Sequence, residues 1–224
     1  GMMLWQLNDC WPVVSWSGID YYGRWKALQY FIRRFYEPVL VSAQEQGTEV
    51  SLWISNETKL ECSGRIYWKL YGKGEKILDE GSKAVVMKAG ESLPVVQLDY
   101  SGVIKEEEKR QAYLFFEWEQ GEERKSGTVL FVLPREFCFP EPELSVEIRE
   151  TGNDYVIEAA ARHFVRAAGF DTSEGDCIFS DNYFDLPPGG RRVIKVDKGS
   201  CRHISDLEDL KKQLTVRTLN DVMR

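Results

Sequence analysis

The sequence predicts a mainly β protein in which two β-sandwiches in tandem follow a single β/α unit. Three observations support this prediction. Aromatic residues are concentrated near the start of the chain, apolar and polar residues alternate in short runs from residue 39 onward, and a proline-marked segment at 134–142 interrupts those runs. Alternation with a period of two residues is typical of half-buried strands. We therefore expect a head at 1–37, a first sandwich at 38–136 and a second sandwich at 137–224.

The head is expected to contain one strand, a long loop and one helix. Residues 3–7 form a short apolar run that predicts a strand, and residues 8–22 are rich in turn-forming Pro, Ser, Gly and Asp. Between residues 24 and 36, apolar side chains recur at three- and four-residue steps, which predicts a helix that Pro38 ends. The apolar stripe of this helix comprises Trp25, Leu28, Phe31, Ile32 and Phe35. Because one β/α unit cannot bury its own strand, we expect its sheet neighbours to lie outside this sequence.

Residues 39–133 contain short runs in which apolar and polar side chains alternate, separated by turns that contain glycine or asparagine. The runs lie at 39–43, 50–54, 66–70, 84–88, 93–98, 112–118 and 127–133. About seven short strands in about 95 residues indicate an immunoglobulin-like sandwich. The charged run at 105–110 carries both signs, and we expect it to be a solvated loop.

A second series of strands is expected after the proline-marked segment. Its runs lie at 144–149, 154–160, 164–168, 177–180, 183–186, 192–196 and 214–219. Residues 205–213 break the alternation and predict a short helix, with Ser205 as its N-cap and Glu208 completing a capping box. Asp181 and Asn182 fit a tight turn with positive φ. The second region is therefore also interpreted as an immunoglobulin-like domain.

The composition argues against several classes of partner. With 29 Lys and Arg against 36 Asp and Glu, the net charge of -7 opposes binding to a phosphate backbone. No run is long and apolar enough to span a bilayer. The five cysteines form no CxxC pair and favour free thiols over a metal site, and the acidic loop at 171–176 lacks the spacing of a calcium loop. We expect no nucleic acid, no membrane, no metal and no cofactor.

The candidate binding residues lie at the start of the chain. Trp5 offers a broad apolar ring beside Gln6, Asn8 and Asp9, three groups that can hydrogen-bond hydroxyls. Sugars require this mixture, because a pyranose stacks a face of C–H groups on an aromatic ring and turns a rim of hydroxyls toward amides and carboxylates. Asn8 and Asp9 could equally cap backbone groups of the turn.

Two motifs resemble a known family. Residues 5–42, which read WQLNDCWPVVSWSGIDYYGRWKALQYFIRRFYEPVLVS, resemble the end of the (β/α)8 barrel in β-mannosidases of glycoside hydrolase family 2, continuing into their next domain. Residues 179–189, which read FSDNYFDLPPG, resemble a segment of that family's C-terminal immunoglobulin-like domain. The resemblance implies that the head is the last strand, loop and helix of a TIM barrel, and that the chain is the C-terminal part of a larger enzyme.

The resemblance also implies what the chain cannot do alone. Retaining enzymes of this family use two glutamates about 5 to 5.5 Å apart, and both belong to earlier barrel strands. Glu37, Glu45 and Glu49 are the first glutamates here and follow the head helix, so none matches a catalytic position. We expect no catalytic residue in this chain and no hydrolysis of a β-mannoside by it alone. Trp5 is expected to stack on the mannose ring once the barrel is present.

Alternative interpretations remain at this point. A free-standing carbohydrate-binding or structural module could use Trp53, Trp68 or Trp118, although their positions within strands favour core packing. Without its barrel, the head at 1–37 is expected to fold onto the first sandwich, to pair with another copy of the chain or to be disordered, because its large apolar residues favour burial. The sequence leaves the compartment unknown: it would be periplasmic or secreted if the source is a bacterium and lysosomal if the source is an animal.

Overall fold

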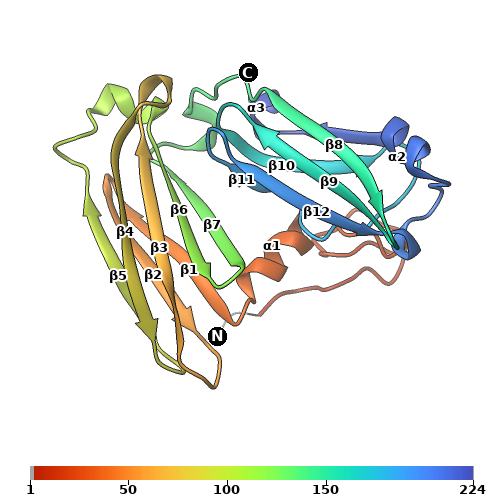
Figure 1. Cartoon of the computed structure of the whole chain (residues 1–224), viewed down its shortest axis with the longest axis horizontal. Coiled ribbons are helices and arrows are strands. Elements are labelled where there is room, and N and C mark those ends of the chain that lie inside the picture. The colour runs from red at the N-terminus through yellow and green to blue at the C-terminus, as the bar shows by residue number, and fades with distance from the viewer. Residues whose placement is uncertain (1–2, 224) are drawn as a thin grey trace. The chain divides into compact units, whose positions relative to one another are not determined.

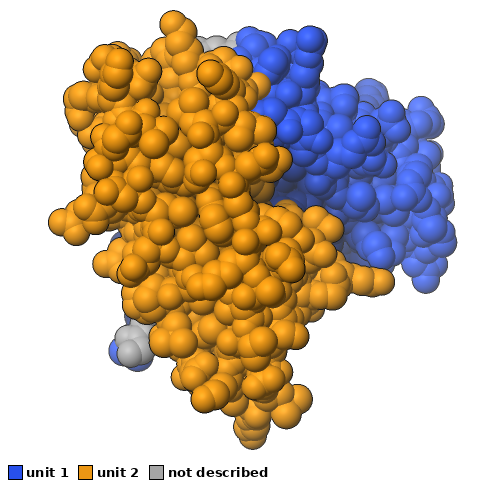
Figure 2. Space-filling view, turned by 60° about the vertical axis from the view of Figure 1, so that its left-hand side comes forward, with its two compact units in different colours: residues 1–35, 140–222, 224 blue, residues 36–139, 223 orange. Residues whose placement is uncertain are grey.

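A computed structural model describes residues 3–223 of the chain. Strands dominate it, as the ribbon in Figure 1 shows, and the chain divides into two compact units. Residues 36–139 form one unit, which we call the first sandwich. Residues 3–35 and 140–222 form the other, which we call the head-bearing unit; Figure 2 colours the two units separately. The predicted mainly β fold class is confirmed, and the sheets of the described residues include no closed barrel.

The first sandwich consists of two antiparallel sheets. The smaller sheet has the order β1 (Val39–Gln46), β2 (Glu49–Asn56), β5 (Ser92–Asp99). The larger sheet has the order β4 (Ile77–Met87), β3 (Cys62–Tyr71), β6 (Tyr113–Gln120), β7 (Glu123–Leu130). Short 3-10 helices lie at Lys73–Glu75, Glu106–Gln111 and Pro134–Glu136. The charged run, expected to be a loop, thus contributes most of one helical segment, and its side chains remain largely exposed.

Alternating side chains build the core of the first sandwich. Leu52 and Ile54 of β2 are fully buried, as are Leu114 and Trp118 of β6. Because successive side chains on a strand point to opposite faces, each strand contributes every second residue to one apolar cluster. These residues are the ones whose alternation predicted the strands.

The described residues of the head-bearing unit form two three-stranded antiparallel sheets and three helices. One sheet has the order β12 (Arg191–Asp197), β9 (Asp154–Ala161), β8 (Leu144–Thr151). The other has the order β11 (Phe184–Leu186), β10 (Val165–Thr172), β13 (Leu214–Arg217). The helices are α1 (Ala27–Phe35), α2 (Leu207–Gln213) and α3 (Leu219–Val222), with a 3-10 helix at Lys198–Ser200. No helix of the described residues is long and apolar enough to cross a membrane.

Helix α1 buries only part of its predicted apolar stripe, in which Ile32 is 9 % exposed, together with one residue outside the stripe. Leu28 and Phe35 belong to that stripe but are exposed, whereas Tyr30 lies outside it and is only 3 % exposed. The reason is that Tyr30 joins the apolar cluster of the C-terminal sandwich, which Trp25 also contacts. The head therefore packs on the second sandwich, and the expectation that it folds onto the first sandwich or is disordered is wrong.

Two segments expected to be strands are irregular. Residues 3–7 form no strand, and an isolated bridge joins Asn8 to Ile19 instead. Residues 177–180 likewise have only an isolated bridge, between Phe179 and Val196. In both places the local composition suits a strand, but a strand also requires neighbours that supply a hydrogen-bond ladder, and these segments lack a continuous one.

Two turn assignments also differ from the sequence prediction. Helix α2 begins after Asp206, whose carboxylate accepts a hydrogen bond from the backbone nitrogen of Asp209, whereas Ser205 was expected to be the N-cap. Ser205 instead donates from its own backbone and hydroxyl to the Asp209 carboxylate. In the 181–183 turn the residue with positive φ is Tyr183, at 54°. Asn182 instead uses its side chain to hydrogen-bond the neighbouring strand at Phe170.

Candidate functional site

The head loop is shaped by backbone hydrogen bonds between its two ends. The Ile19 nitrogen donates to the Leu7 carbonyl at 2.9 Å, and the Asp9 nitrogen donates to the Ile19 carbonyl at 3.0 Å. The Lys26 nitrogen donates to the Gly18 carbonyl at 2.9 Å, which joins the end of the loop to the start of α1. Residues 6–9, 17–19 and 25–26 therefore lie side by side without forming a regular sheet.

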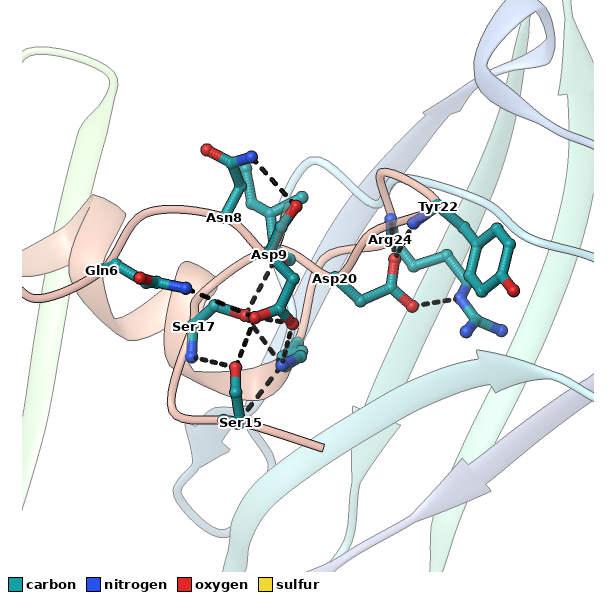
Figure 3. A network of polar contacts seen from close by, with 10 residues as sticks. Gln6, Asn8, Asp9, Ser15, Ser17, Asp20, Tyr22 and Arg24 are labelled. Atoms are coloured by element: carbon teal, nitrogen blue, oxygen red, sulfur yellow. Dashed lines mark hydrogen bonds and ion pairs between the residues drawn. The ribbon is translucent and has the colours of Figure 1, made fainter. Parts of the chain in front are cut away.

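The Asp9 carboxylate lies at the centre of this loop (Figure 3) and is only 3 % exposed. Ser15 Oγ donates to Oδ1 at 2.5 Å, and Ser17 Oγ donates to Oδ2 at 2.8 Å. Lys26 Nζ donates to Oδ2 at 3.1 Å and also to Ser17 Oγ at 2.8 Å. A buried carboxylate requires such partners, because it has lost its hydration. The network therefore fixes the loop from inside.

The electrostatics of Asp9 agree with this geometry. The Ser15 hydrogen bond is the largest cause that lowers the pKa of Asp9, to about 2, and burial opposes it. The Ser17 hydroxyl and the Lys26 ammonium lower the pKa further. Asp9 is consequently ionised at neutral pH, and its charge is compensated within the head.

The four residues singled out from the sequence do not share one orientation. Trp5 is 77 % exposed, whereas Asp9 points into the loop. Gln6 has an intermediate exposure, and its Nε2 is 3.5 Å from Asp9 Oδ1. Asn8 is exposed, and its Nδ2 donates to the Asp9 carbonyl at 3.2 Å. Trp5 is thus the most freely presented of the four, and Asp9 is occupied by partners within the chain.

Sequence reasoning missed the residues that hold Asp9. Ser15 and Ser17 lie in the segment that is rich in turn-forming residues, and Lys26 lies in the predicted helix outside its apolar stripe. Lys26 is 17 positions from Asp9 in the sequence, so no local spacing connects the two. The available signal was the presence, in one short loop, of a carboxylate and two hydroxyl residues that could hydrogen-bond to it.

A second carboxylate shapes the turn that leads into α1. Asp20 Oδ1 accepts hydrogen bonds from the backbone nitrogens of Tyr22 and Arg24, both at 2.9 Å, and Arg24 Nε donates to Oδ2 at 2.5 Å (Figure 3). Gly23 has a φ of 85°, which a glycine adopts without steric cost. Arg202 Nη1 then donates to the Tyr22 carbonyl at 2.9 Å and connects this turn to the C-terminal sandwich.

Tyr30 is the centre of the contact between α1 and the C-terminal sandwich. Its hydroxyl accepts a hydrogen bond from the Phe179 nitrogen at 3.2 Å, and its ring lies 5.8 Å from the Tyr183 ring and 5.3 Å from the Trp25 ring. Burial is the largest cause that raises the pKa of Tyr30, so its hydroxyl is neutral at physiological pH. Aromatic pairs at these separations pack favourably.

Two arginines of α1 add polar contacts to the same segment. Arg33 Nη1 donates to the Ser180 carbonyl at 2.8 Å. Arg34 donates to the Asp181 carboxylate at 2.8 Å, to the Tyr183 carbonyl at 3.3 Å and to the Asn182 carbonyl. The guanidinium group presents several donors in a fixed plane, which suits this cluster of acceptors.

Asn182 connects that segment to the sheet behind it. Its side-chain oxygen accepts from the Phe170 nitrogen at 2.7 Å, and its side-chain nitrogen donates to the Phe170 carbonyl at 2.8 Å. The Asn182 side-chain amide therefore pairs with the backbone of β10 at Phe170, as a residue of a neighbouring strand would. The 179–186 motif, interpreted as structural from the sequence, thus receives α1 on one side and supports β10 on the other.

The other residues considered from the sequence have structural contacts. Trp118 is fully buried, and Trp68 is partly buried with its indole nitrogen donating to Asp79 at 3.2 Å. Asn56 starts an Asn-Glu-Thr sequon, but its amide nitrogen is buried and donates to the carbonyls of Leu60, Met87 and Lys88. Within the described part of the chain, no group of three or more His, Cys, Asp or Glu residues is arranged to hold a metal ion.

The comparisons with family models define the class of protein. Residues 48–136 match the family described as a mannosidase Ig/CBM-like domain. Residues 139–222 match the Ig-fold domain family Ig_mannosidase. Two successive domains of the mannosidase type therefore account for most of the chain.

Similar proteins place these domains in a longer context. A β-mannosidase of Mus musculus is 27 % identical over 194 residues, which are 82 % of this chain and 22 % of that protein. The crystal structure of a β-D-mannosidase from Dictyoglomus thermophilum aligns with a TM-score of 0.81 and 19 % identity, over 96 % of this chain and 25 % of that one. An exo-chitosanase of Amycolatopsis orientalis aligns with a TM-score of 0.65 and 12 % identity, over 96 % of this chain and 29 % of that one.

The chain spans about a quarter of the length of these relatives. The two family matches show that the chain carries two successive immunoglobulin-like domains of the mannosidase type. Their order and the β-mannosidase relatives support its correspondence to the C-terminal region of the β-mannosidases of glycoside hydrolase family 2. The resemblance stated from the two sequence motifs is thereby confirmed.

Proposed function

We propose that this chain is the non-catalytic C-terminal region of a retaining β-mannosidase, which removes terminal β-D-mannose residues from β-mannosides. In this proposal the head contributes an aromatic wall of the sugar site, and the two sandwiches support the barrel that carries the catalytic glutamates. Trp5 stacks on the mannose ring, and Gln6 and Asn8 supply amide contacts to hydroxyls. Asp9 acts as a positioning residue, because its carboxylate is occupied by Ser15, Ser17 and Lys26.

The observation that carries this proposal is the contrast between Trp5 and Asp9. The loop is fixed from inside by the buried Asp9 carboxylate and its partly buried partner Lys26, yet it presents a tryptophan that is 77 % exposed. Exposing such a ring to water is unfavourable by roughly 1.5 to 3 kcal/mol relative to burial. A rigid loop with an exposed aromatic ring is the arrangement that sugar stacking requires.

The apolar surface of the head supports the need for a further domain. Its exposed large apolar side chains are Met3, Leu4, Trp5, Leu7, Trp11, Val13, Val14, Trp16, Tyr21, Tyr22, Leu28, Phe35 and Tyr36. Exposed apolar patches of this kind mark interaction sites. We propose that the barrel covers most of this surface in the full enzyme, and that the isolated head self-associates through it. Leu28 and Phe35, the part of the helix stripe left exposed, would face the barrel.

The glutamates nearest the head support the absence of catalysis by the chain alone. Glu37 lies beyond α1 and pairs with Lys125 Nζ at 2.9 Å, and Glu45 and Glu49 lie on β1 and β2. None of the three stands on the loop that carries Trp5. The proposal therefore assigns both the general acid/base and the nucleophile to the barrel.

The test is reconstitution of the enzyme from two parts. The chain alone should neither hydrolyse an aryl β-mannoside nor bind mannose detectably by calorimetry. Supplying the preceding barrel as a co-expressed chain should restore hydrolysis. Hydrolysis by the purified chain, or failure of a folded two-part complex to act on β-mannosides, would overturn the proposal.

Trp5 is tested in the same reconstituted enzyme. Trp5→Ala should lower kcat/KM by about 10- to 100-fold, since stacking and burial of an indole ring contribute on the order of 1.5 to 3 kcal/mol. Trp11→Ala is the matched control, because Trp11 is a similarly exposed tryptophan of the same loop. Equal losses for both variants would contradict a specific stacking role for Trp5.

A further inference from the structure

Cys177 and Cys201 lie opposite each other at the base of the head. Cys177 belongs to the irregular segment between β10 and β11, and Cys201 follows the 3-10 helix at Lys198–Ser200. Their Sγ atoms are 2.7 Å apart. An S–S bond measures about 2.05 Å, so a movement of less than about 1 Å would bring the two sulfurs to bonding distance.

The backbone around these cysteines is already arranged for a cross-link. Asp176 and Arg202 form an isolated antiparallel bridge, with the Asp176 nitrogen donating to the Arg202 carbonyl at 3.0 Å and the Arg202 nitrogen donating back at 2.8 Å. In an antiparallel pair, the residues next to such a doubly bonded pair face each other at the shorter Cα separation. Cys177 and Cys201 occupy this position, and that separation lies within the range of disulfides.

We propose that Cys177 and Cys201 form a disulfide that joins the two segments on which the head rests. This proposal is independent of the proposed function, since it concerns the chain's own covalent structure. A small-molecule disulfide such as oxidised glutathione is the oxidant. One protein thiolate attacks it and releases one reduced glutathione, and the second protein thiolate then attacks the mixed disulfide and releases another. The two protein thiols lose two protons and two electrons, and the glutathione disulfide gains them.

The cross-link acts on the segments that bind the head. Arg202 donates to the Tyr22 carbonyl at 2.9 Å, and Arg24 Nε lies 3.9 Å from Asp176 Oδ1. Trp25, Cys177 and Cys201 all pack against the apolar cluster of the C-terminal sandwich. A bond between the two sulfurs would therefore fix both sides of the surface that receives residues 20–25.

Burial has a consequence for when the bond forms. Burial is the largest cause that raises the pKa of the Cys177 thiol, and it is also the largest cause that raises the pKa of the Cys201 thiol. The thiolate is the nucleophile in disulfide exchange, so the folded, reduced pair reacts slowly at neutral pH. Formation is expected to be faster while the segments are still assembling than after the head has packed.

The experiment equilibrates the whole chain with a glutathione redox couple, once from the native state and once during refolding from urea. Free thiols are then alkylated in acid-quenched samples, and the digest is examined by mass spectrometry. The expected result is a peptide linking Cys177 to Cys201, with the other three of the five cysteines alkylated. Reduction should lower the melting temperature of the head-bearing unit by roughly 5–15 °C.

Variants make the result specific. Cys177→Ser and Cys201→Ser should each remove both the linked peptide and the effect of reduction on melting. Cys138→Ser changes an exposed cysteine in the other unit and should retain both. A folded chain in which neither route links Cys177 to Cys201, or a linkage that leaves the melting temperature unchanged, would overturn the proposal.

Discussion

Asp9 is the residue on which the order of the head loop depends. Its folded pKa, about 2, lies below the ordinary value of 3.8, mainly through the Ser15 hydrogen bond. A lowered carboxyl pKa contributes stability that is complete above the unfolded value and is lost as the pH falls through the folded value. The head is therefore expected to loosen between about pH 4 and pH 2, and this change should be local to residues 5–26.

Hydrogen exchange with pulse labelling at a constant pH measures this change. Samples held between pH 4.5 and pH 2 should show increasing exchange in head peptides as the Asp9 carboxylate is protonated. Asp9→Asn serves as the control, since it removes the titrating group and should give faster exchange in the head with little dependence on pH in this range. A head whose exchange is unchanged from pH 4.5 to pH 2 in the original chain would contradict the role given to Asp9.

Single residues also show what the sequence could and could not predict about the site. The mixture of Trp5 with Gln6, Asn8 and Asp9 directed attention to a loop that the structure organises around Asp9, because those residue types are informative by themselves. Their orientations were not predictable in the same way. Whether a carboxylate points outward to a hydroxyl or inward to Ser15 and Lys26 depends on contacts between residues far apart in the sequence, which no local pattern encodes.

At the scale of elements, the strands of both sandwiches were predictable because alternation directly reflects which face is buried. Helix α1 was predictable as a helix but not in its orientation. Ile32 of the predicted stripe is buried, but Leu28 and Phe35 are exposed. Tyr30, which lies outside the stripe, joins the apolar cluster of the C-terminal sandwich. Residues 177–180 had a strand-like composition without strand neighbours. The local sequence pattern thus identifies an element, whereas the segment that packs against the element decides which of its faces is buried.

Tyr30 allows the attachment of α1 to be tested. Tyr30→Phe removes the hydroxyl that accepts from the Phe179 nitrogen and should lower the free energy of unfolding of the head-bearing unit by about 1 kcal/mol. Tyr30→Ala also removes a buried ring and should lower it by about 3 to 5 kcal/mol. Leu28→Ala is the matched control, because Leu28 lies on the same helix and is exposed, and its effect should stay within about 0.5 kcal/mol.

Urea unfolding followed by circular dichroism gives these free energies. The order of the three losses of free energy matters more than their absolute values. If Tyr30 attaches the helix, Tyr30→Ala must cause the largest loss and Leu28→Ala the smallest. A larger loss for Leu28→Ala than for Tyr30→Ala would mean that the apolar stripe, rather than Tyr30, holds the helix.

At the scale of the whole molecule, the chain has two apolar cores that share no residue. One contains Leu52, Ile66 and Trp118 of the first sandwich. The other contains Ile157 and Phe170 of the head-bearing unit, together with Tyr30 from the head. The second core is thus built from segments that are far apart in the sequence, so residues 140–222 alone lack part of it. The head is a structural component of the C-terminal sandwich as well as the carrier of Trp5.

Separate cores predict separate responses to mutation. Leu52→Ala and Ile157→Ala each truncate a fully buried side chain and should each cost about 2 to 5 kcal/mol. Hydrogen exchange resolved by peptide should place the loss from Leu52→Ala in residues 36–139, and the loss from Ile157→Ala in residues 140–222 and in α1. The double variant should show the sum of the two, because distant sites without shared partners are additive. Faster exchange in α1 after Leu52→Ala would show that the two cores are coupled. Faster exchange in α1 after Ile157→Ala alone would show that the surface presenting Trp5 depends on the C-terminal sandwich.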